Sequence, residues 1–236
     1  MQRLEIIPVP GLPEVRPGDD LAGQILEAVG AIGGVADGDV LVVSQKVVSK
    51  AEGRLVKVDP DDPLAHKPLV LAEAARVVRR RGDLIITETH HGYVCANSGI
   101  DRSNVDPDVA ALLPEDSDRS ARRLRDAIRF RTGTTVAVIV ADTFGRPWRR
   151  GLTDIALGSA GIRPIIDLRG TTDAGGRELH VTEVCVVDEL AGAAELVRGK
   201  ASGIAVALIR GVDPAWFGEG EVVREVVRDP SEDLFR

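Results

Sequence analysis

Side chains that could take part in phosphoryl chemistry directly follow the apolar run Val136–Ala141. Asp142 and Thr143 come first. A glycine turn then brings three arginines, Arg146, Arg149 and Arg150. A carboxylate and a hydroxyl at the end of a buried strand can bind Mg²⁺ or Mn²⁺, and guanidinium groups bind phosphate or carboxylate through paired hydrogen bonds. The spacing therefore indicates phosphoryl chemistry with a metal ion; the alternative is a strand end capped by Asp142, with solvated arginines beside it.

A second carboxylate that could bind a metal is Asp101, in the segment ANSGIDRSN over residues 96–104. It lies beside Ser103 and Asn104, which also carry oxygen atoms. Two carboxylates from distant loops are a typical set of ligands for Mg²⁺. Taken alone, the segment is better explained as an Asx turn, which Asn and Asp form for local reasons.

Two of the five lysines in the chain, Lys46 and Lys50, lie in SQKVVSKAEGR, residues 44–54, after an apolar run. An ammonium group beside the hydroxyls of Ser44 and Ser49 can hold a polyphosphate as a point charge. The alternative interpretation is a polar exit from a strand into a loop.

The histidines and cysteines give weaker evidence for a functional site than the segments above. His90 and His91 are adjacent, and neighbouring residues of a strand point to opposite faces, so at most one of them could serve a site. Cys95 and Cys185 are far apart and lack metal-ligand spacing, so we expect small buried side chains and no zinc site. With no GxSxG segment either, nucleophilic catalysis by the protein is not supported.

Composition excludes several classes of protein. The 236 residues are enough for one large domain or two small ones, and 44% hydrophobic with 28% charged residues is ordinary for a globular protein. A net charge of −7 and an aromatic content of 3% oppose nucleic-acid binding. There is neither GxGxxG after a first strand nor GxxxxGK[ST]. Few cysteines and no signal or spanning segment predict a reduced, cytoplasmic setting without a membrane partner.

Hydrophobic periodicity and turn residues predict elements that alternate along the chain. We expect strands over residues 4–9, 39–44, 84–88, 136–141, 178–187 and 204–210. We expect helices over residues 21–29, 71–80, 117–131, 157–162, 188–198 and 221–228. Asp19 or Asp20 should cap the first helix, and Ser117 or Asp118 the third. Residues 89–106 should form a long loop, of the kind that is usually functional.

Four segments, in this order and spacing, resemble the coenzyme F420-0:γ-glutamyl ligase family. They are PVPGLPEVRPGDDL (8–21), GDVLVVSQKVVSKAEGR (38–54), GYVCANSGIDRSNV (92–105) and ADTFGRPWRRGLTDIALGSAGI (141–162). The similarity continues through 177–197 and 205–211, and so covers nearly the whole chain. It implies an α/β (mixed α+β) fold particular to this family, without a P-loop or a Rossmann fingerprint. The expected organisation is one domain over 1–236, alternatively two intertwined subdomains, with no C-terminal flavin reductase domain in this chain.

The resemblance also implies an activity. Enzymes of this family use GTP to join L-glutamate to F420-0, and lengthen the tail of the deazaflavin coenzyme F420 by γ-linked peptide bonds. The implied intermediate is an acyl phosphate, the implied cofactor is a divalent metal (Mg²⁺ or Mn²⁺), with K⁺ as a candidate further ion, and the implied assembly is a cytoplasmic homodimer. The alternatives are a metal-dependent GTP phosphohydrolase and a non-catalytic GTP-binding module.

Residue by residue, the resemblance implies a metal site and a nucleotide site. The metal ligands would be Asp101 and Asp142, with Thr143 on a second ion. The residues expected to contact GTP are Leu12, Pro13, Glu14, Val15, Gln45, Lys50, Asn104, Gly199, Lys200, Ala201, Ser202 and Gly203. The residues expected to act in catalysis are Asp142, Lys50, Arg146, Arg149 and Arg150, the cations stabilising the transferred phosphoryl group and the anionic substrate. The chain departs from its relatives at Gly199, where an oxygen side chain is often found, and at Gln45, which replaces a small hydroxyl.

Overall fold

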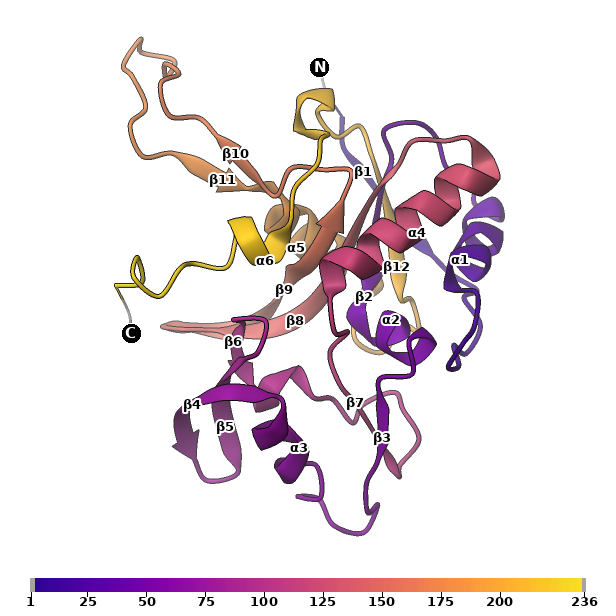
Figure 1. The fold of residues 1–236 in the computed structure, drawn as a ribbon. Helices are drawn as coiled ribbons and strands as arrows, with labels where there is room; N and C mark the ends of the chain where they lie inside the picture. The colour runs from indigo at the N-terminus through magenta and orange to yellow at the C-terminus, as the bar shows by residue number, and fades with distance from the viewer. Residues whose placement is uncertain (1–2, 235–236) are drawn as a thin grey trace.

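A five-stranded mixed sheet forms the centre of the computed structural model, which describes residues 3–234 (Figure 1). The strand order is β1-β12-β2-β8-β9. The bounds are Glu5–Val9 for β1, Val40–Ser44 for β2, Ala137–Arg146 for β8, Arg149–Ala160 for β9 and Val206–Arg210 for β12. β2 and β8 pair in parallel, whereas the other neighbouring pairs are antiparallel. The mixed α/β class expected from the sequence is confirmed.

Helices cover both faces of this sheet (Figure 1). On one face lie α1 (Leu21–Gly30), α2 (Gln45–Ala51) and α4 (Ser117–Thr132); on the other lies α5 (Val186–Arg198). In β2, Leu41 and Val43 face the first group, while Val40 and Val42 face α5. Burial on both faces is why β2 is a continuous apolar run rather than an alternating one.

Residues 55–111 form a separate small lobe beside the sheet, below it in Figure 1. Its elements are β3 (Leu55–Lys57), α3 (Lys67–Ala72), β4 (Ala74–Arg81), β5 (Leu84–Thr89), β6 (Val94–Ala96), the 3₁₀ turn Asn97–Gly99 and β7 (Val109–Ala111). The lobe has its own apolar core, with Val70, Ile85 and Ile100 buried. The long loop expected over 89–106 therefore contains β6 and a 3₁₀ turn.

Two predicted helices are strands. Residues 71–80 lie mostly in β4, which pairs antiparallel with β5 through the turn at Gly82. Pairing with β5 outweighs the helical pattern, since strand preference depends on the neighbouring strand. Residues 157–162 lie mostly in β9; the small side chains there let α4 approach, because a Cβ on Gly158 would lie 2.2 Å from the backbone carbon of Ser117.

Helix caps and shorter elements differ in detail from the expectation. Asp20 caps α1, as predicted, but Asp116 rather than Ser117 or Asp118 caps α4. Asp118 is instead buried, and its carboxylate accepts hydrogen bonds from the backbone of Ser159, Val222 and Val223.

Residues 45–51 form helix α2, which was not predicted, and the predicted strand 178–187 is reduced to β11 (Glu183–Cys185). β11 pairs with β10 (Ile165–Asp167) at the base of an arm that projects from the body (Figure 1). The 3₁₀ turn Pro214–Trp216 and α6 (Val222–Glu225) follow β12. Among the described residues, no helix combines the length and the apolar character needed to cross a membrane.

Candidate functional site

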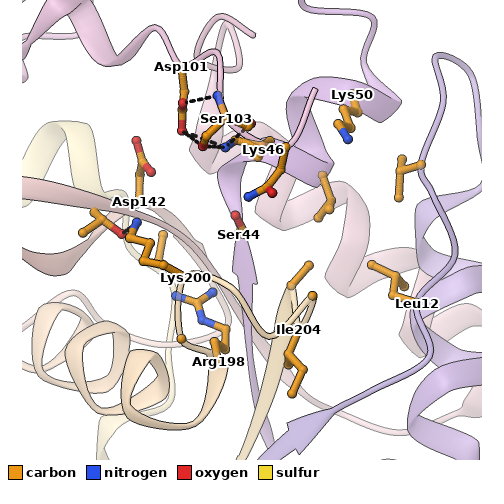
Figure 2. Close-up of a pocket in the computed structure, with 18 of the residues that line it drawn as sticks. Leu12, Ser44, Lys46, Lys50, Asp101, Ser103, Asp142, Arg198, Lys200 and Ile204 are labelled. Atoms are coloured by element: carbon orange, nitrogen blue, oxygen red, sulfur yellow. Dashed lines mark hydrogen bonds and ion pairs between the residues drawn. The ribbon is translucent and has the colours of Figure 1, made fainter. Parts of the chain in front are cut away.

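A cleft of about 650 Å³ opens where β2 ends, between the sheet and the small lobe (Figure 2). Six parts of the chain line it: residues 12–15, Ser44 with α2, part of the 101–104 segment of the small lobe, the middle of β8, Asp154 of β9, and several residues between Glu195 and Ala205. Segments that are far apart in the sequence thus meet here, and most of the predicted site residues lie among them.

Asp142 reaches the cleft because β8 is longer than its parallel neighbour. The last pair between the two strands is Ser44 with Ala141, so Asp142 is the first residue of β8 beyond the end of β2. The register shifts between Val140 and Ala141, where Leu157 of β9 is the extra, unpaired residue, so the bulge lies in β9 opposite this part of β8. The sequence predicted that this strand ends at residue 141. It instead continues to Arg146, where it forms a two-stranded ribbon with β9.

The carboxyl group of Asp142 lacks compensating charge. Its pKa is raised to about 7, mainly by burial and also by the nearby carboxylates of Asp101 and Asp154, although the backbone N–H of Thr143 and the charge of Lys200 oppose the rise. Figure 2 shows its carboxylate directed toward Asp101. A cation placed between the two carboxylates would favour the charged form of Asp142.

Asp101 is held by Lys46, which the sequence suggested as a polyphosphate-binding cation but not as a partner of this carboxylate. Lys46 Nζ lies 2.7 Å from Asp101 Oδ2 and also donates to the backbone oxygen and the hydroxyl of Ser103 (Figure 2). Ser103 N donates to Asp101 Oδ1 at 2.7 Å, which is the Asx turn considered above. Burial raises the pKa of Asp101, but the hydrogen bonds from Lys46 and Ser103 outweigh it and hold the pKa below its ordinary value. The sequence feature that pointed to Lys46 was its place, together with Lys50, directly after a buried strand.

A chain of polar contacts joins β8, β9 and the end of α5. Thr143 Oγ1 donates to Asp154 Oδ1 and accepts from Lys200 Nζ, and Arg198 Nη2 donates to Asp154 Oδ2. Asp154 and Arg198 are each only 3% exposed. Arg198 Nε and Nη1 have no hydrogen-bond partner within the described part of the chain. Because Arg198 lines the cleft, these buried donors could bind an anionic group there.

Asp154 and Arg198 were not among the predicted site residues. Asp154 lies in a segment with no other acidic residue nearby. Arg198 resembles the basic residues that are common in the last turn of a helix. Only the pairing of β8 with β9, which sets Thr143 opposite Asp154, and the packing of α5 on the sheet bring them to the cleft.

Most of the residues expected to contact a nucleotide line this cleft. They are Leu12, Pro13, Glu14, Val15, Lys50, Asn104, Gly199, Lys200, Ala201 and Gly203. Lys50 is paired with Glu14, with Nζ 2.5 Å from Oε1. Two others do not line it: Gln45 is fully buried, where it accepts a hydrogen bond from Ser49, and the Ser202 hydroxyl is bound to the backbone of its own loop.

The three arginines after Asp142 lie away from the cleft. Arg146, Arg149 and Arg150 are exposed at the outer end of the β8–β9 ribbon. At the rise of an extended strand, Arg146 lies about 13 Å along β8 from Asp142. In this arrangement Lys46, Arg198 and Lys200, rather than the ribbon arginines, are the cations next to the carboxylates of the cleft.

The histidines and cysteines lie outside the cleft. His90 and His91 contact the backbone oxygens of Ala72 and Glu115 through their Nε2 atoms. Cys95 is buried, and burial raises its pKa to about 12. No thiolate nucleophile is expected from such a group.

The oxygen-bearing residues of the cleft fit a magnesium-type ion. No group of three or more His, Cys, Asp or Glu side chains suited to metal binding occurs among the described residues. Mg²⁺, however, is commonly held by one or two carboxylates, with water and substrate phosphates completing its shell. Asp142, whose pKa is raised mainly by burial, and Asp101 supply these two carboxylates, with the hydroxyl of Thr143 next to Asp142.

Comparison with known proteins agrees with this geometry. The family model described as F420-0:Gamma-glutamyl ligase matches residues 11–211. The Coenzyme F420:L-glutamate ligase of Methanopyrus kandleri is 44% identical over 250 residues, covering 99% of this chain and 98% of that protein. Proteins of the same name from Methanothermobacter thermautotrophicus and Methanocaldococcus jannaschii are 39% and 41% identical, covering 99% and 86% of this chain. This chain therefore belongs to the F420-0:gamma-glutamyl ligase family.

Proposed function

We propose that this protein is a ligase that joins L-glutamate to F420-0, and then adds further γ-linked glutamates, with GTP as the source of energy. The observation that carries the proposal is the cleft itself. It holds two carboxylates suited to a divalent ion, Asp101 and Asp142, next to the cations Arg198 and Lys200, inside a chain that belongs to the ligase family.

The charge distribution of the cleft supports phosphoryl transfer. Activation of a carboxylate by a nucleoside triphosphate brings several negative oxygens together, and such reactions are catalysed mainly by positioning and by charge stabilisation. Lys46 and Lys50 lie on the α2 side of the cleft, and Lys200 and Arg198 lie on the α5 side. A divalent ion held by Asp142 and Asp101 would supply Lewis-acid neutralisation of the phosphates.

The proposed reaction has two steps that need no protein nucleophile. In the first, the terminal carboxylate of F420-0 attacks the γ-phosphorus of GTP, and GDP leaves with the electrons of the broken P–O bond. In the second, the amine of L-glutamate attacks the acyl carbon, phosphate leaves, and an amide forms with loss of one proton. The residues of the cleft position the anions and stabilise their charge. We also propose that the protein is a homodimer, which sedimentation velocity would test.

Phosphate release from GTP tests the ligase assignment, with F420-0 and L-glutamate each omitted in turn, in Mg²⁺ or Mn²⁺. The ligase predicts phosphate release that requires both F420-0 and L-glutamate, with a product one glutamyl unit heavier by mass spectrometry. Release with GTP alone would identify a phosphohydrolase instead. Binding of GTP without any release would identify a binding module and contradict the proposal.

A further inference from the structure

The tip of the β8–β9 ribbon has an unusual backbone conformation. Arg146 pairs with Arg149, so Pro147 and Trp148 are the two residues of the turn. Trp148 has a φ of 57°, in the left-handed region. A turn with proline first and a positive φ second normally has glycine or asparagine at the second position, because a bulky side chain is disfavoured there.

The side chain of Trp148 does not serve the core either. It is 81% exposed, and the three ribbon arginines beside it are exposed as well. A disfavoured backbone conformation that displays a large aromatic ring is a feature found at functional sites. The tip therefore presents a flat aromatic surface next to guanidinium groups, which suits a ligand that is both aromatic and anionic.

The ribbon connects this tip with Thr143 and Asp154, two residues that line the cleft. Thr143 and Asp154 are paired across the two strands, and two residues further out Gly145 is paired with Leu152. Alternation along a strand places both pairs on the same face, and Leu152 is 65% exposed. At the rise of an extended strand, Trp148 lies about 20 Å along the ribbon from Asp142. A face with a glycine and an apolar side chain thus leads from the cleft to the tip.

We propose that this tip binds the deazaflavin ring and adjacent negative charge of the F420 substrate, with Trp148 stacking on the ring and the arginines contacting the anion. The proposal rests on the proposed ligase function. The ring and the growing tail are opposite ends of that substrate, so the end that reacts can lie at Asp142 while the ring lies far along the ribbon. The tip then selects the substrate by its ring.

The discriminating variant is Trp148→Gly, because glycine adopts a positive φ without strain. A role of Trp148 in the fold would make this variant less stable; the proposal predicts an unchanged or higher melting temperature together with lost affinity. We expect at least a tenfold higher Kd for F420-0, measured by fluorescence anisotropy of the deazaflavin ring with GDP present. We expect the KM for F420-0 to rise likewise, with the KM values for GTP and L-glutamate unchanged. Trp148→Phe should retain most of the affinity.

Charge is tested with Arg149→Ala, matched by Arg79→Ala, an exposed arginine on β4 of the small lobe. The first should weaken F420-0 binding and the second should not. Equal affinity of wild type and Trp148→Gly for F420-0 would overturn the proposal. So would conversion of a dimer to monomers by Trp148→Gly in sedimentation velocity, since the tip would then be a contact between copies.

Failure of this proposal can be told apart from failure of the ligase function. If the wild-type protein adds no glutamate to F420-0, the ligase function is wrong. If the wild type is an active ligase and Trp148→Gly retains the wild-type KM for F420-0, only the ring site is wrong.

Discussion

Asp154 on β9 and Arg198 at the end of α5 form an ion pair in which each residue is only 3% exposed. The same carboxylate accepts a hydrogen bond from Thr143, so the pair connects the helix, the ribbon and the cleft. The residues that follow Arg198 line the cleft, and the pair therefore sets where that loop begins. A buried pair of this kind stabilises the site geometry more than it stabilises the fold.

Arg198→Ala should destabilise the protein, because it leaves the Asp154 carboxylate buried without its partner. We expect a loss of about 3–5 kcal/mol in the free energy of unfolding, measured by urea denaturation. Arg76→Ala breaks the partly exposed pair with Glu88 and should cost less than about 1 kcal/mol. Equal losses of unfolding free energy for the two variants would show that the buried pair with Asp154 contributes no more to stability than the partly exposed pair.

Asp142→Asn should abolish most turnover without damage to the fold. Asparagine keeps the shape of the side chain but removes the negative charge that would bind a divalent ion. We expect a fall of at least about a hundredfold in GTP-dependent phosphate release with all substrates present. Asp61→Asn, at an exposed position of the small lobe, is the matched control and should be as active as the wild type. Near-normal turnover of Asp142→Asn would contradict the role assigned to this carboxylate.

The stability of the metal-free protein should depend on pH through Asp142. Its pKa is raised from 3.8 to about 7 in the folded state, so the folded state holds a proton that the unfolded state releases. The contribution of this group is fully present below about pH 4 and is lost as the pH rises through 7. Urea unfolding in the presence of a chelator should therefore show a decrease in stability over this range that Asp142→Asn lacks. Parallel pH profiles for the two proteins would contradict the assignment.

The affinity for Mn²⁺ should change in the opposite direction with pH. Binding requires the ionised carboxylate, so the protein should bind Mn²⁺ more tightly as the pH rises from 5 to 8 and release a proton on binding. Isothermal titration in two buffers of different ionisation enthalpy would measure this release. Affinity independent of pH over this range would place the ion away from Asp142.

Gly158→Ala should disrupt the contact between α4 and β9. The added Cβ would lie 2.2 Å from the backbone carbon of Ser117, a group that cannot move without shifting the helix. We expect destabilisation of about 1–3 kcal/mol or more, seen as a lower melting temperature and urea midpoint. Gly30→Ala is the control, since no atom lies within 4 Å of its added Cβ, and it should leave stability unchanged or slightly higher.

The local hydrophobic pattern of the sequence was sufficient to predict the strands that are buried on both faces and the helices that are clearly amphipathic. The strands around residues 40–44 and 206–210 and the helices α1, α4 and α5 were predicted near their observed bounds. Their signals, a continuous apolar run or a 3.6-residue period, lie within the element itself. Asp101 and Asp142 were likewise found from sequence, because each follows or lies within a distinctive local segment, and both line the cleft.

Tertiary structure decided those features that depend on a neighbouring strand or helix. The helical pattern of residues 71–80 became strand β4 once β5 was beside it, and the small residues of β9 pair with β8 rather than form a helix. Lys46 and Arg198 joined the site, while the ribbon arginines were carried out to its tip. Side chains that are neighbours in the sequence separate by about 3.3 Å per residue along an extended strand, whereas strand pairing and helix packing bring distant ones into contact. Sequence therefore determined which chemical groups this chain has, and the path of β8 past the end of β2 determined which of them meet.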